Sequence, residues 1–512
     1  MEKLKSGICY LVGAGPGDLG MVTLRAKECI EMADVIAYDY LVNREVLAWA
    51  RKDAEIIYVG KKADLHTLPQ DKINELLIKK VQAGNIVTRL KGGDPMVFGR
   101  GGEEAEELFD AGCRFEIVPG ISSTIAGAAY AGIPVTHRSH NTQLTIFTGH
   151  EDPTKEESTL DFEKLAKADG VKVMLMGVQR IGILMDKLIA NGAVPTTPVA
   201  LVRWATTGRQ QTVTGTMETI AAIVEAAGFK APAVCIMGGT VTLRDKLRWF
   251  DNRPLFGKRV VVTRTRNQAG DLTRRLRALG ADVYEIPTIR IEQPMNMMMF
   301  GECVEDAHKY EWIVFTSPNG VTAFFDLFYK IYRDARSIGG CRIAAIGPGT
   351  ERKIREYHLE VDFVPEASVA ESFVSEFVEQ FGTVDNTNFL WVRGEDARPI
   401  ITQELTKLGA IVDEAIAYRT VPEREDVTGA QKRFREEGAD ILTFASSSAV
   451  ENFLKLKLPM PEGIRIASIG PITSKTIREH GMKVDIESVT KHDIPHFVEA
   501  ILEAEGADVA TM

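Results

Sequence analysis

Residues 87–102, VTRLKGGDPMVFGRGG, hold the side chains and glycines best suited to binding or catalysis in the first half of the chain. Residues 87–90 are predicted to form a short buried strand, which the glycine pair and proline of residues 91–95 end abruptly. Bare backbone at the carboxyl end of a strand lets a ligand approach closely, and Asp94 offers a carboxylate to hydroxyls or positive charge. A tight strand-to-helix turn that binds nothing would contain the same residues, so both interpretations stay open.

A second group of candidates lies nearer the start of the chain, in GAGPGDLG at residues 13–20 and at Asp39. The glycine-rich turn follows a strand predicted over 8–12, and Asp39 ends a strand predicted over 35–38. A turn of this kind and an acid about two dozen residues later imitate a dinucleotide-binding fingerprint. Pro16 and Gly20, however, displace the helix predicted over 21–32 from the position that would meet a pyrophosphate. A nicotinamide-dependent dehydrogenase is therefore only an alternative.

The elements that position these residues alternate between strands and helices. Further buried strands are predicted over 115–118, 173–176, 199–202 and 233–237, each followed by glycine, proline or hydroxyl residues. Such alternation is typical of the α/β class, in which the ends of neighbouring strands meet at one edge of a sheet. We therefore expect the small and hydroxyl residues after these strands to form one composite pocket.

Length and composition limit the possible classes. At 512 residues the chain exceeds a single hydrophobic core, so more than one domain is expected. A net charge of −10 argues against nucleic-acid binding. The absence of an apolar run near the roughly 20 residues of a membrane span, or of a signal peptide, predicts a cytoplasmic protein. The six scattered cysteines suggest neither disulfides nor a zinc site.

The second half begins after a polar seam at residues 250–257 and contains an internal repeat. WIVFTSPNGVTAFF, from Trp312, matches ILTFASSSAVENFL, from Ile441, and CRIAAIGPGT, from Cys341, matches IRIASIGPIT, from Ile464. These pairs, and a third that begins at Arg259 and Phe389, lie about 120 to 130 residues apart, which indicates two copies of one strand-helix unit. Their hydroxyl and glycine residues precede helix starts, where they would bind anions or simply cap the helices.

Five ordered motifs of the first half, VGAGPGD, VIAYDYLV, VGK, GGDPMVFGRGGEE and VPGISS, resemble uroporphyrinogen-III C-methyltransferase of the tetrapyrrole methylase family. The resemblance covers residues 7–249 and implies a methyltransferase domain over 1–249 with two α/β subdomains, active as a homodimer. It implies Asp39 as proton acceptor and Lys61 as proton donor, although Tyr40 stands where the family often has arginine. The implied contacts of S-adenosylmethionine are Pro16, Gly92, Gly93, Asp94, Val97, Ser122, Ser123, Met176 and Ala205.

The implied chemistry suits these residues. A sulfonium methyl is an activated electrophile and the pyrrole carbons of a reduced tetrapyrrole are nucleophiles, so the enzyme has to align them and remove a proton, without a metal. The many carboxylates of the substrate require arginines. Those at or near strand-end loops are Arg25, Arg44, Arg100 and Arg138. Ordinary alternatives are a turn cap for Asp39, a surface lysine for Lys61 and solvated arginines.

The second half resembles uroporphyrinogen-III synthase through VVVTR, FTSPNGV, RGEDAR, YRT, SSSAVENF and IGPITSKTIREHG. The resemblance implies a two-lobed α/β domain over 257–507 with a discontinuous first lobe, 257–290 plus 421–507, and a second lobe, 291–419, joined by a two-stranded connector. Tyr418 would assist departure of the hydroxyl of hydroxymethylbilane during ring closure, or would be a packed connector aromatic. The implied carboxylate-binding residues are Arg264, Ser317, Arg393, Ser446, Ser447 and Thr473.

The two resemblances support each other, since the product of the second half is the substrate of the first. The sequence thus predicts one polypeptide that closes hydroxymethylbilane to uroporphyrinogen III and methylates it twice to precorrin-2, a precursor of sirohaem and corrinoids. A catalytically silent, tetrapyrrole-binding second half is the other hypothesis, and ring closure by the fragment from Gly257 onward would exclude it. Titration with NAD(H) and with S-adenosylmethionine would show which of the two is bound. Binding of NAD(H) would favour the dehydrogenase, and binding of S-adenosylmethionine the methyltransferase.

Overall fold

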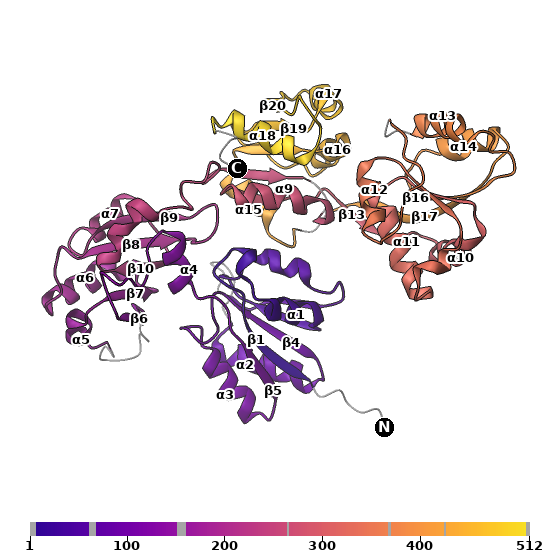
Figure 1. Ribbon diagram of the computed structural model, residues 1–512. Helices are drawn as coiled ribbons and strands as arrows, with labels where there is room; N and C mark the ends of the chain where they lie inside the picture. The colour runs from indigo at the N-terminus through magenta and orange to yellow at the C-terminus, as the bar shows by residue number, and fades with distance from the viewer. Residues whose placement is uncertain are drawn as a thin grey trace. The chain divides into compact units, whose positions relative to one another are not determined.

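The computed structural model describes residues 7–60, 68–150, 160–263, 266–366, 370–423 and 426–507 (Figure 1). Two compact units divide the chain: Met1–Ile286 with Glu425–Met512, and Pro287–Arg424. The described residues form four five-stranded sheets, three in the first unit and one in the second. Helices alternate with most of the strands along the chain, so the predicted α/β class is confirmed.

The first sheet is parallel throughout, in the order β3-β2-β4-β1-β5. Its central strands β1 and β4 are buried on both faces because helices cover both, as parallel sheets require. All five strands end at one edge. The elements are β1 Ile8–Gly13, α1 Leu24–Met32, β2 Val35–Tyr38, β3 Glu55–Tyr58, α2 Gln70–Gln82, β4 Ile86–Lys91, α3 Gly101–Asp110, β5 Arg114–Val118 and α4 Ser123–Tyr130, with the 3-10 turns η1 Leu19–Met21 and η2 Arg44–Trp49.

The helix predicted over residues 21–32 begins three residues later, at Leu24. Thr23 caps it by accepting a hydrogen bond from the N–H of Ala26. The residues before it form the turn η1, which Asp18 caps through the N–H of Gly20. The long glycine loop between β1 and α1 therefore carries its own local hydrogen bonds and does not lead directly into a helix.

The second sheet is mixed, in the order β6-β7-β10-β8-β9, with β6 and β7 parallel and the other pairs antiparallel. A core of aliphatic side chains and methionines packs one face against α6 and α7. The elements are β6 Leu144–Thr148, α5 Phe162–Lys167, β7 Val171–Leu175, η3 Val178–Arg180, α6 Ile181–Ala190, β8 Pro198–Arg203, β9 Gln211–Thr216, α7 Ile220–Ala226, β10 Ala233–Met237, η4 Gly239–Leu243 and α8 Arg244–Leu247.

The third sheet completes the first unit and is built from two distant stretches of chain, in the parallel order β12-β11-β18-β19-β20. We call its residues, 257–286 and 426–507, lobe one. β11 pairs with β12 on one side and with β18, from beyond the second unit, on the other. The elements are β11 Arg259–Val262, α9 Arg266–Ala278, β12 Asp282–Glu285, α15 Ala430–Glu437, β18 Ile441–Phe444, α16 Ser447–Lys455, β19 Arg465–Ser468, α17 Pro471–Glu479, β20 Ile486–Glu487 and α18 Ile494–Ala504.

The fourth sheet forms the second unit, in the order β13-β17-β16-β14-β15. β13 runs antiparallel to the end of β17, and these two strands lie where the chain enters and leaves the second unit. Buried phenylalanines of α11 and α13 fill the two faces. The elements are β13 Ile289–Glu292, α10 Met297–Glu305, η5 Ala307–Lys309, β14 Trp312–Phe315, α11 Pro318–Ile331, η6 Ala335–Ile338, β15 Arg342–Ala345, α12 Pro348–Arg355, α13 Ala370–Phe381, β16 Asn388–Gly394, α14 Ile400–Lys407 and β17 Ile411–Pro422.

The sequence repeat appears as the same succession of elements in both lobes. β14, α11, β15 and α12 of the second unit correspond to β18, α16, β19 and α17 of lobe one. Ser317 and Ser446 cap the first helix of each set, and a Gly-Pro pair opens the second. Within the described ranges, no helix is both long and apolar enough to span a bilayer.

Candidate active sites

The carboxyl edge of the first sheet brings three glycine-bearing loops together, as the sequence predicted. Gly15 and Gly93 exchange backbone hydrogen bonds, with N···O distances of 3.2 and 2.7 Å. A Cβ atom on Gly120 would lie 2.3 Å from the carbonyl oxygen of Gly93, and one on Gly13 would lie 2.5 Å from the nitrogen of Gly120. The loops after β1, β4 and β5 can therefore meet only as bare backbone, which leaves N–H and C=O groups at this edge accessible to a ligand.

Asp94 holds two of these loops together. Its Oδ2 accepts a hydrogen bond from the N–H of Gly120 at 3.0 Å, and its Oδ1 accepts one from the N–H of Met96 at 2.8 Å. Each carboxylate oxygen can accept a second bond, so the group still has capacity for a ligand hydroxyl. Val97 follows in the same loop, and Ser122 and Ser123 begin α4 beside it, where Ser122 caps the helix.

The loops of the second sheet that face this edge have strained backbone. Met176, Trp204 and Thr206 have φ angles of 56°, 46° and 72°, which residues other than glycine rarely adopt. Thr206 accepts a hydrogen bond from the N–H of Asp18 at 3.1 Å, which ties the loop after β8 to the loop that contains Pro16. Ala205 is buried between them. Strain of this kind persists where the surrounding structure enforces it, commonly at binding sites.

Asp39 lies at the end of β2, with its two carboxylate oxygens engaged differently. Oδ1 caps the turn by accepting from the N–H of Leu41 at 3.1 Å, and Oδ2 lies 3.4 Å from Nη2 of Arg89. The turn cap that the sequence left as an alternative is thus present. The second oxygen faces a buried cation and the cavity described below. Lys61, the predicted proton donor, lies outside the described residues, as does Arg264.

A buried charge cluster behind Asp39 was missed from the sequence. Arg89, Lys91 and Glu104 are almost fully buried, and Glu104 Oε1 accepts from Arg89 Nε at 3.2 Å and from Lys91 Nζ at 2.8 Å. Burial lowers the pKa of Lys91, and the nearby charge of Arg89 acts in the same direction. Glu104 Oε2 has no hydrogen-bond partner among the described residues. The available signal was Arg89 inside a strand predicted to be buried, with Lys91 directly after it.

Of the four predicted substrate arginines of the first half, only Arg44 lines the cavity at this edge. Its guanidinium lies 5.8 Å from the ring centroid of Tyr38. Arg25 instead pairs with Glu116 and Glu28, both at 3.1 Å, and Arg100 pairs with Glu103. Arg138 is exposed and does not line the cavity. Arg25 and Arg100 thus have acidic partners within the protein, which come from α1, β5 and α3.

The cavity itself has a volume of about 550 Å³, within the size range of small-molecule sites. Its wall from the first half combines aromatic rings with charged side chains. These lining residues are Pro16, Gly17, Asp18, Leu19, residues 38–45, Tyr58, Trp204, residues 206–209, Phe250 and Arg253.

In the second unit, Tyr418 and Ser317 share a hydrogen bond of 2.9 Å. Ser317 caps α11, and Tyr418 lies in β17, where the pairing with β16 shifts register at Gly394. A Cβ atom on Gly394 would lie 2.9 Å from the Tyr418 ring, so a glycine is needed for the ring to pack there. Burial raises the pKa of Tyr418, while the bond to Ser317 opposes that effect. The hydroxyl is therefore protonated at neutral pH and able to donate.

Arg393 does not have the geometry expected of a substrate contact. Its guanidinium is buried and donates to Glu414 at 2.7 Å and to the carbonyl oxygens of Gly394, Glu395 and Ala397. These bonds occupy most of its donors and fix the RGEDAR loop. The structure thus gives Arg393 a structural role.

In lobe one, the starts of α16 and α17 lie side by side. Ser446 caps α16 through the N–H of Ala449, and Ser447 accepts a hydrogen bond from Thr476 at 2.8 Å. Thr473 is nearly buried in the first turn of α17. Two neighbouring helix starts with serine side chains form an arrangement suited to carboxylates.

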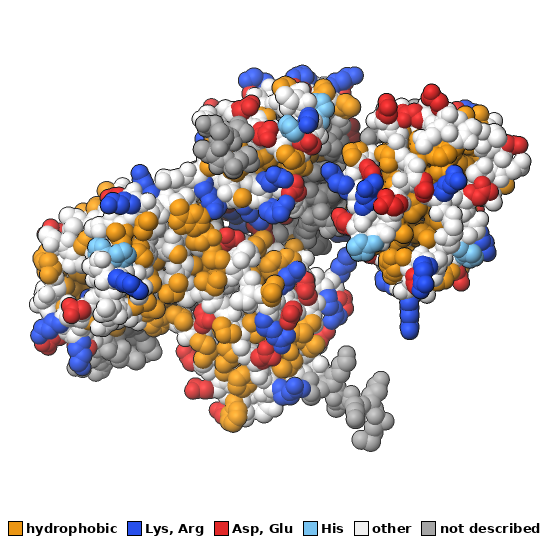
Figure 2. Space-filling view, viewed as in Figure 1, with side chains coloured by type: hydrophobic (Ala, Val, Ile, Leu, Met, Phe, Trp, Pro, Cys, Tyr) orange, Lys and Arg blue, Asp and Glu red, His pale blue; other side chains and the backbone are white. Residues whose placement is uncertain are grey.

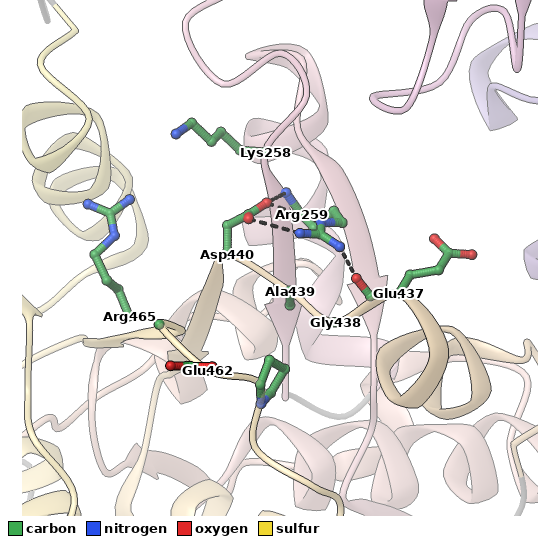
Figure 3. Close-up of a pocket in the computed structure, with 10 residues that line it drawn as sticks. Lys258, Arg259, Glu437, Gly438, Ala439, Asp440, Glu462 and Arg465 are labelled. Atoms are coloured by element: carbon green, nitrogen blue, oxygen red, sulfur yellow. Dashed lines mark hydrogen bonds and ion pairs between the residues drawn. The ribbon is translucent and has the colours of Figure 1, made fainter. Parts of the chain in front are cut away.

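A second hollow, of about 420 Å³, lies at the amino ends of β11, β18 and β19, the end opposite to these helix starts (Figure 3). Arg259 faces Asp440 there, with Nη2 and Oδ1 3.1 Å apart. Lys258 and Arg465 both pair with Glu505. Because its charges neutralise one another, we assign it no ligand. No cluster of side chains suited to a metal ion occurs in the described ranges.

The chain has two parts that are both typical of α/β enzymes. The first part has a glycine-lined edge at the strand ends of its parallel sheet, and the second part consists of two lobes with repeated elements. Comparison with known families agrees: the family Tetrapyrrole (Corrin/Porphyrin) Methylases matches residues 9–221, and Uroporphyrinogen-III synthase HemD matches residues 270–499. The porphyrin biosynthesis protein HemD of Ruminiclostridium josui is 34% identical over 508 residues, which cover 99% of this chain and 100% of that protein. The chain therefore belongs to the HemD family of porphyrin biosynthesis proteins.

Other similarities concern the first half alone. An S-adenosyl-L-methionine-dependent uroporphyrinogen III methyltransferase of Methanosarcina barkeri is 51% identical over 241 residues, covering 47% of this chain and 94% of that protein. Among solved structures, uroporphyrin-III C-methyl transferase from Thermus thermophilus, complexed with S-adenyl homocysteine, is 36% identical. It covers 46% of this chain and 99% of that chain, with a TM-score of 0.40.

Proposed function

We propose that the chain is a bifunctional enzyme of tetrapyrrole biosynthesis. Its second half closes hydroxymethylbilane to uroporphyrinogen III, and its first half methylates that product twice to give precorrin-2. The observation that supports this most directly is the pair of family matches, one to each half, together with a HemD relative similar over its whole length. We assign residues 1–249 to the methyltransferase domain and 257–507 to the synthase domain.

The strand-end edge of the first sheet suits S-adenosylmethionine. Bare backbone at Gly92 and Gly93 and the capped start of α4 offer N–H and C=O groups without side chains in the way. When bound there, S-adenosylmethionine supplies a methyl group that is already activated as an electrophile. We assign its contacts to Pro16, Gly92, Gly93, Asp94, Val97, Ser122, Ser123, Met176 and Ala205.

Asp39 is the proposed proton acceptor. The cap to Leu41 fixes one carboxylate oxygen, and Arg89 orients the other toward the cavity edge. Methylation of a pyrrole carbon leaves a proton on the ring system that has to be removed, and a carboxylate held by two contacts is a suitable base. Lys61 stays the proposed donor, and Arg44 a proposed contact for a substrate carboxylate.

In the synthase domain, Tyr418 is the proposed proton donor to the departing hydroxyl. The C–O bond of the hydroxymethyl group breaks, the oxygen takes the phenolic proton, and water leaves. Ser317 orients the phenol through their shared hydrogen bond. Ser317, Ser446, Ser447 and Thr473 are proposed carboxylate contacts. We further propose a cytoplasmic homodimer that associates through the methyltransferase domain.

Both activities can be tested on one purified chain. Hydroxymethylbilane is supplied alone, and the ratio of uroporphyrinogen III to the spontaneously formed I isomer is measured after oxidation. Uroporphyrinogen III with radiolabelled S-adenosylmethionine then tests methyl transfer separately. Methyl transfer without catalysed ring closure would support a silent, tetrapyrrole-binding second half and contradict the bifunctional proposal.

A further inference from the structure

The cavity at the methyltransferase edge has a second wall that comes from lobe one of the synthase domain. The loop after α9, the strand β12 and the start of α15 face the residues after β2 across it, all within the first compact unit. Figure 2 shows Lys and Arg side chains gathered over α9. The lining residues from lobe one are Arg277, residues 281–285, residues 428–430, Lys432, Arg433, Glu436 and Glu437.

Close contacts hold this second wall against the methyltransferase domain. Arg277 of α9 forms an ion pair with Glu45 of η2. The N–H of Gly257 donates to the carbonyl oxygen of Gly208 at 3.1 Å. A Cβ atom on Gly208 would lie 2.2 Å from the backbone nitrogen of Asp282, so any side chain at Gly208 would separate the two surfaces. The wall is therefore a packed interface.

Three guanidinium groups on the methyltransferase side of the cavity lack close carboxylate partners. Arg209 lies 3.7 Å from the ring centroid of Trp204, and its ion-pair partner Glu437 is 3.9 Å away. Burial lowers the pKa of Arg209, and the charge of Arg433 acts in the same direction. Arg44 and Arg253 lie over aromatic rings, with no ion pair to any described residue.

Most acids of the lobe-one wall, by contrast, are already neutralised. Asp282 and Glu437 bind Arg433 at 2.7 and 2.8 Å, and Glu436 lies 3.6 Å from Lys432. Glu285 is the remaining lobe-one carboxylate on this wall. Stacked guanidinium groups with unused donors bind carboxylates, and the aromatic rings beside them suit a flat pyrrolic ligand.

We propose that lobe one completes the substrate site of the methyltransferase domain. Carboxylate side chains of the tetrapyrrole are held between Arg44, Arg209 and Arg253 on one side and Lys432 of α15 on the other. This inference rests on the proposed function and adds a contribution from the synthase domain to the methyltransferase reaction. A methyltransferase domain without lobe one would lack that wall.

The test uses the full-length chain and the Lys432→Glu variant. Lys432 and Glu436 form an i,i+4 ion pair on an exposed helix face, and Lys167 and Glu163 of α5 form a matched pair outside the cavity lining. Lys167→Glu is therefore the control. We expect Lys432→Glu to raise the KM for uroporphyrinogen III in methyl transfer about three- to tenfold, the range for one partly screened charge reversal. The KM for S-adenosylmethionine and the rate of ring closure stay unchanged.

A second variant, Thr428→Trp, fills the cavity from the lobe-one side without changing charge, and unchanged ring closure shows that lobe one is still folded. A KM increase of threefold or more in either variant, absent from Lys167→Glu, supports the inference. If both variants keep the wild-type KM for uroporphyrinogen III, or if the control rises equally, lobe one does not take part. A wild-type chain that fails to methylate added uroporphyrinogen III contradicts the proposed function itself, which separates the two failures.

Discussion

Asp39→Asn is the substitution that most directly examines the methyltransferase chemistry. In the wild-type chain, Oδ1 of Asp39 accepts a hydrogen bond from the N–H of Leu41 at 3.1 Å. An asparagine can keep this turn, because its side-chain oxygen can accept the same bond. The amide then turns its NH₂ group toward Arg89, which lies 3.4 Å from Oδ2. Arg89 keeps its bonds to Glu104 and to the carbonyl oxygen of Leu90, so we expect a stability loss of only about 1 kcal/mol.

The catalytic effect is expected to be much larger than the effect on stability. Loss of a positioned general base slows a reaction roughly 100- to 10,000-fold, which corresponds to about 3 to 5 kcal/mol of transition-state stabilisation. Donor binding needs none of the lost charge, so the affinity for S-adenosylmethionine should persist. The substitution therefore tests the role of Asp39 as a general base separately from the binding of S-adenosylmethionine.

The assay is single-turnover transfer of a labelled methyl group from S-adenosylmethionine to uroporphyrinogen III under anaerobic conditions. Ring closure by the same preparation serves as an internal control for folding, and calorimetry measures donor affinity. Asp53→Asn, which removes an exposed partner of Arg51 in the loop before β3, is the matched control. Turnover of Asp39→Asn within a few-fold of wild type would show that Asp39 is only a turn cap.

Three further substitutions examine the other parts of the chain. Gly92→Ala places a Cβ 2.5 Å from Cβ of Leu41 and should abolish detectable donor binding by calorimetry, whereas Gly182→Ala, with ordinary contacts, should not; equal affinities would remove Gly92 from the donor site. Tyr418→Phe should slow ring closure at least tenfold, measured by isomer ratio, and a normal rate would make Tyr418 a packing residue. Asp440→Asn should destabilise lobe one by about 1 kcal/mol at pH 7, since the side chain is one-third exposed. Burial by itself would raise the pKa of Asp440, but the hydrogen bonds and charge of Arg259 together outweigh it and lower the pKa. The contribution of the carboxylate is therefore fully present above the ordinary pKa of 3.8 and declines as the pH falls below it; a difference in unfolding free energy between the two proteins that does not shrink on acidification would refute this.

The class of fold and the strand ends were predictable because they depend on local patterns. Buried runs ended by glycine, proline or aspartate placed β1, β2, β4 and β10 within one or two residues. The start of α1 could not be predicted, because two successive caps, at Asp18 and Thr23, both satisfy the rules for a helix start. Local patterns also predicted the repeat, which appears as the same succession of strands and helices in both lobes.

The partners of charged side chains could not be predicted, since they depend on which distant elements meet. Arg25 and Arg44 both lie near strand-end loops in the sequence, yet only Arg44 lines the cavity. Arg25 instead forms an ion pair with Glu116 of β5. Glu104 gave no signal by itself, although it is the anion that neutralises two buried cations of β4. Arg393 lies in a family motif, and its structural role appears only from the carbonyl groups around it.

The order of strands in lobe one has a consequence for how the chain is made. β11 lies between β12 and β18, and β18 is synthesised only after the whole second unit. At 5–20 residues per second, the free edge of β11 waits roughly 9 to 36 seconds on the ribosome for its partner. During that time the methyltransferase domain, which is complete before β11 emerges, can fold and offer the surface around Glu45 and Gly208 against which α9 and β12 pack. The fused order of the two domains thus gives α9 and β12 a folded surface to pack on before β18 is synthesised.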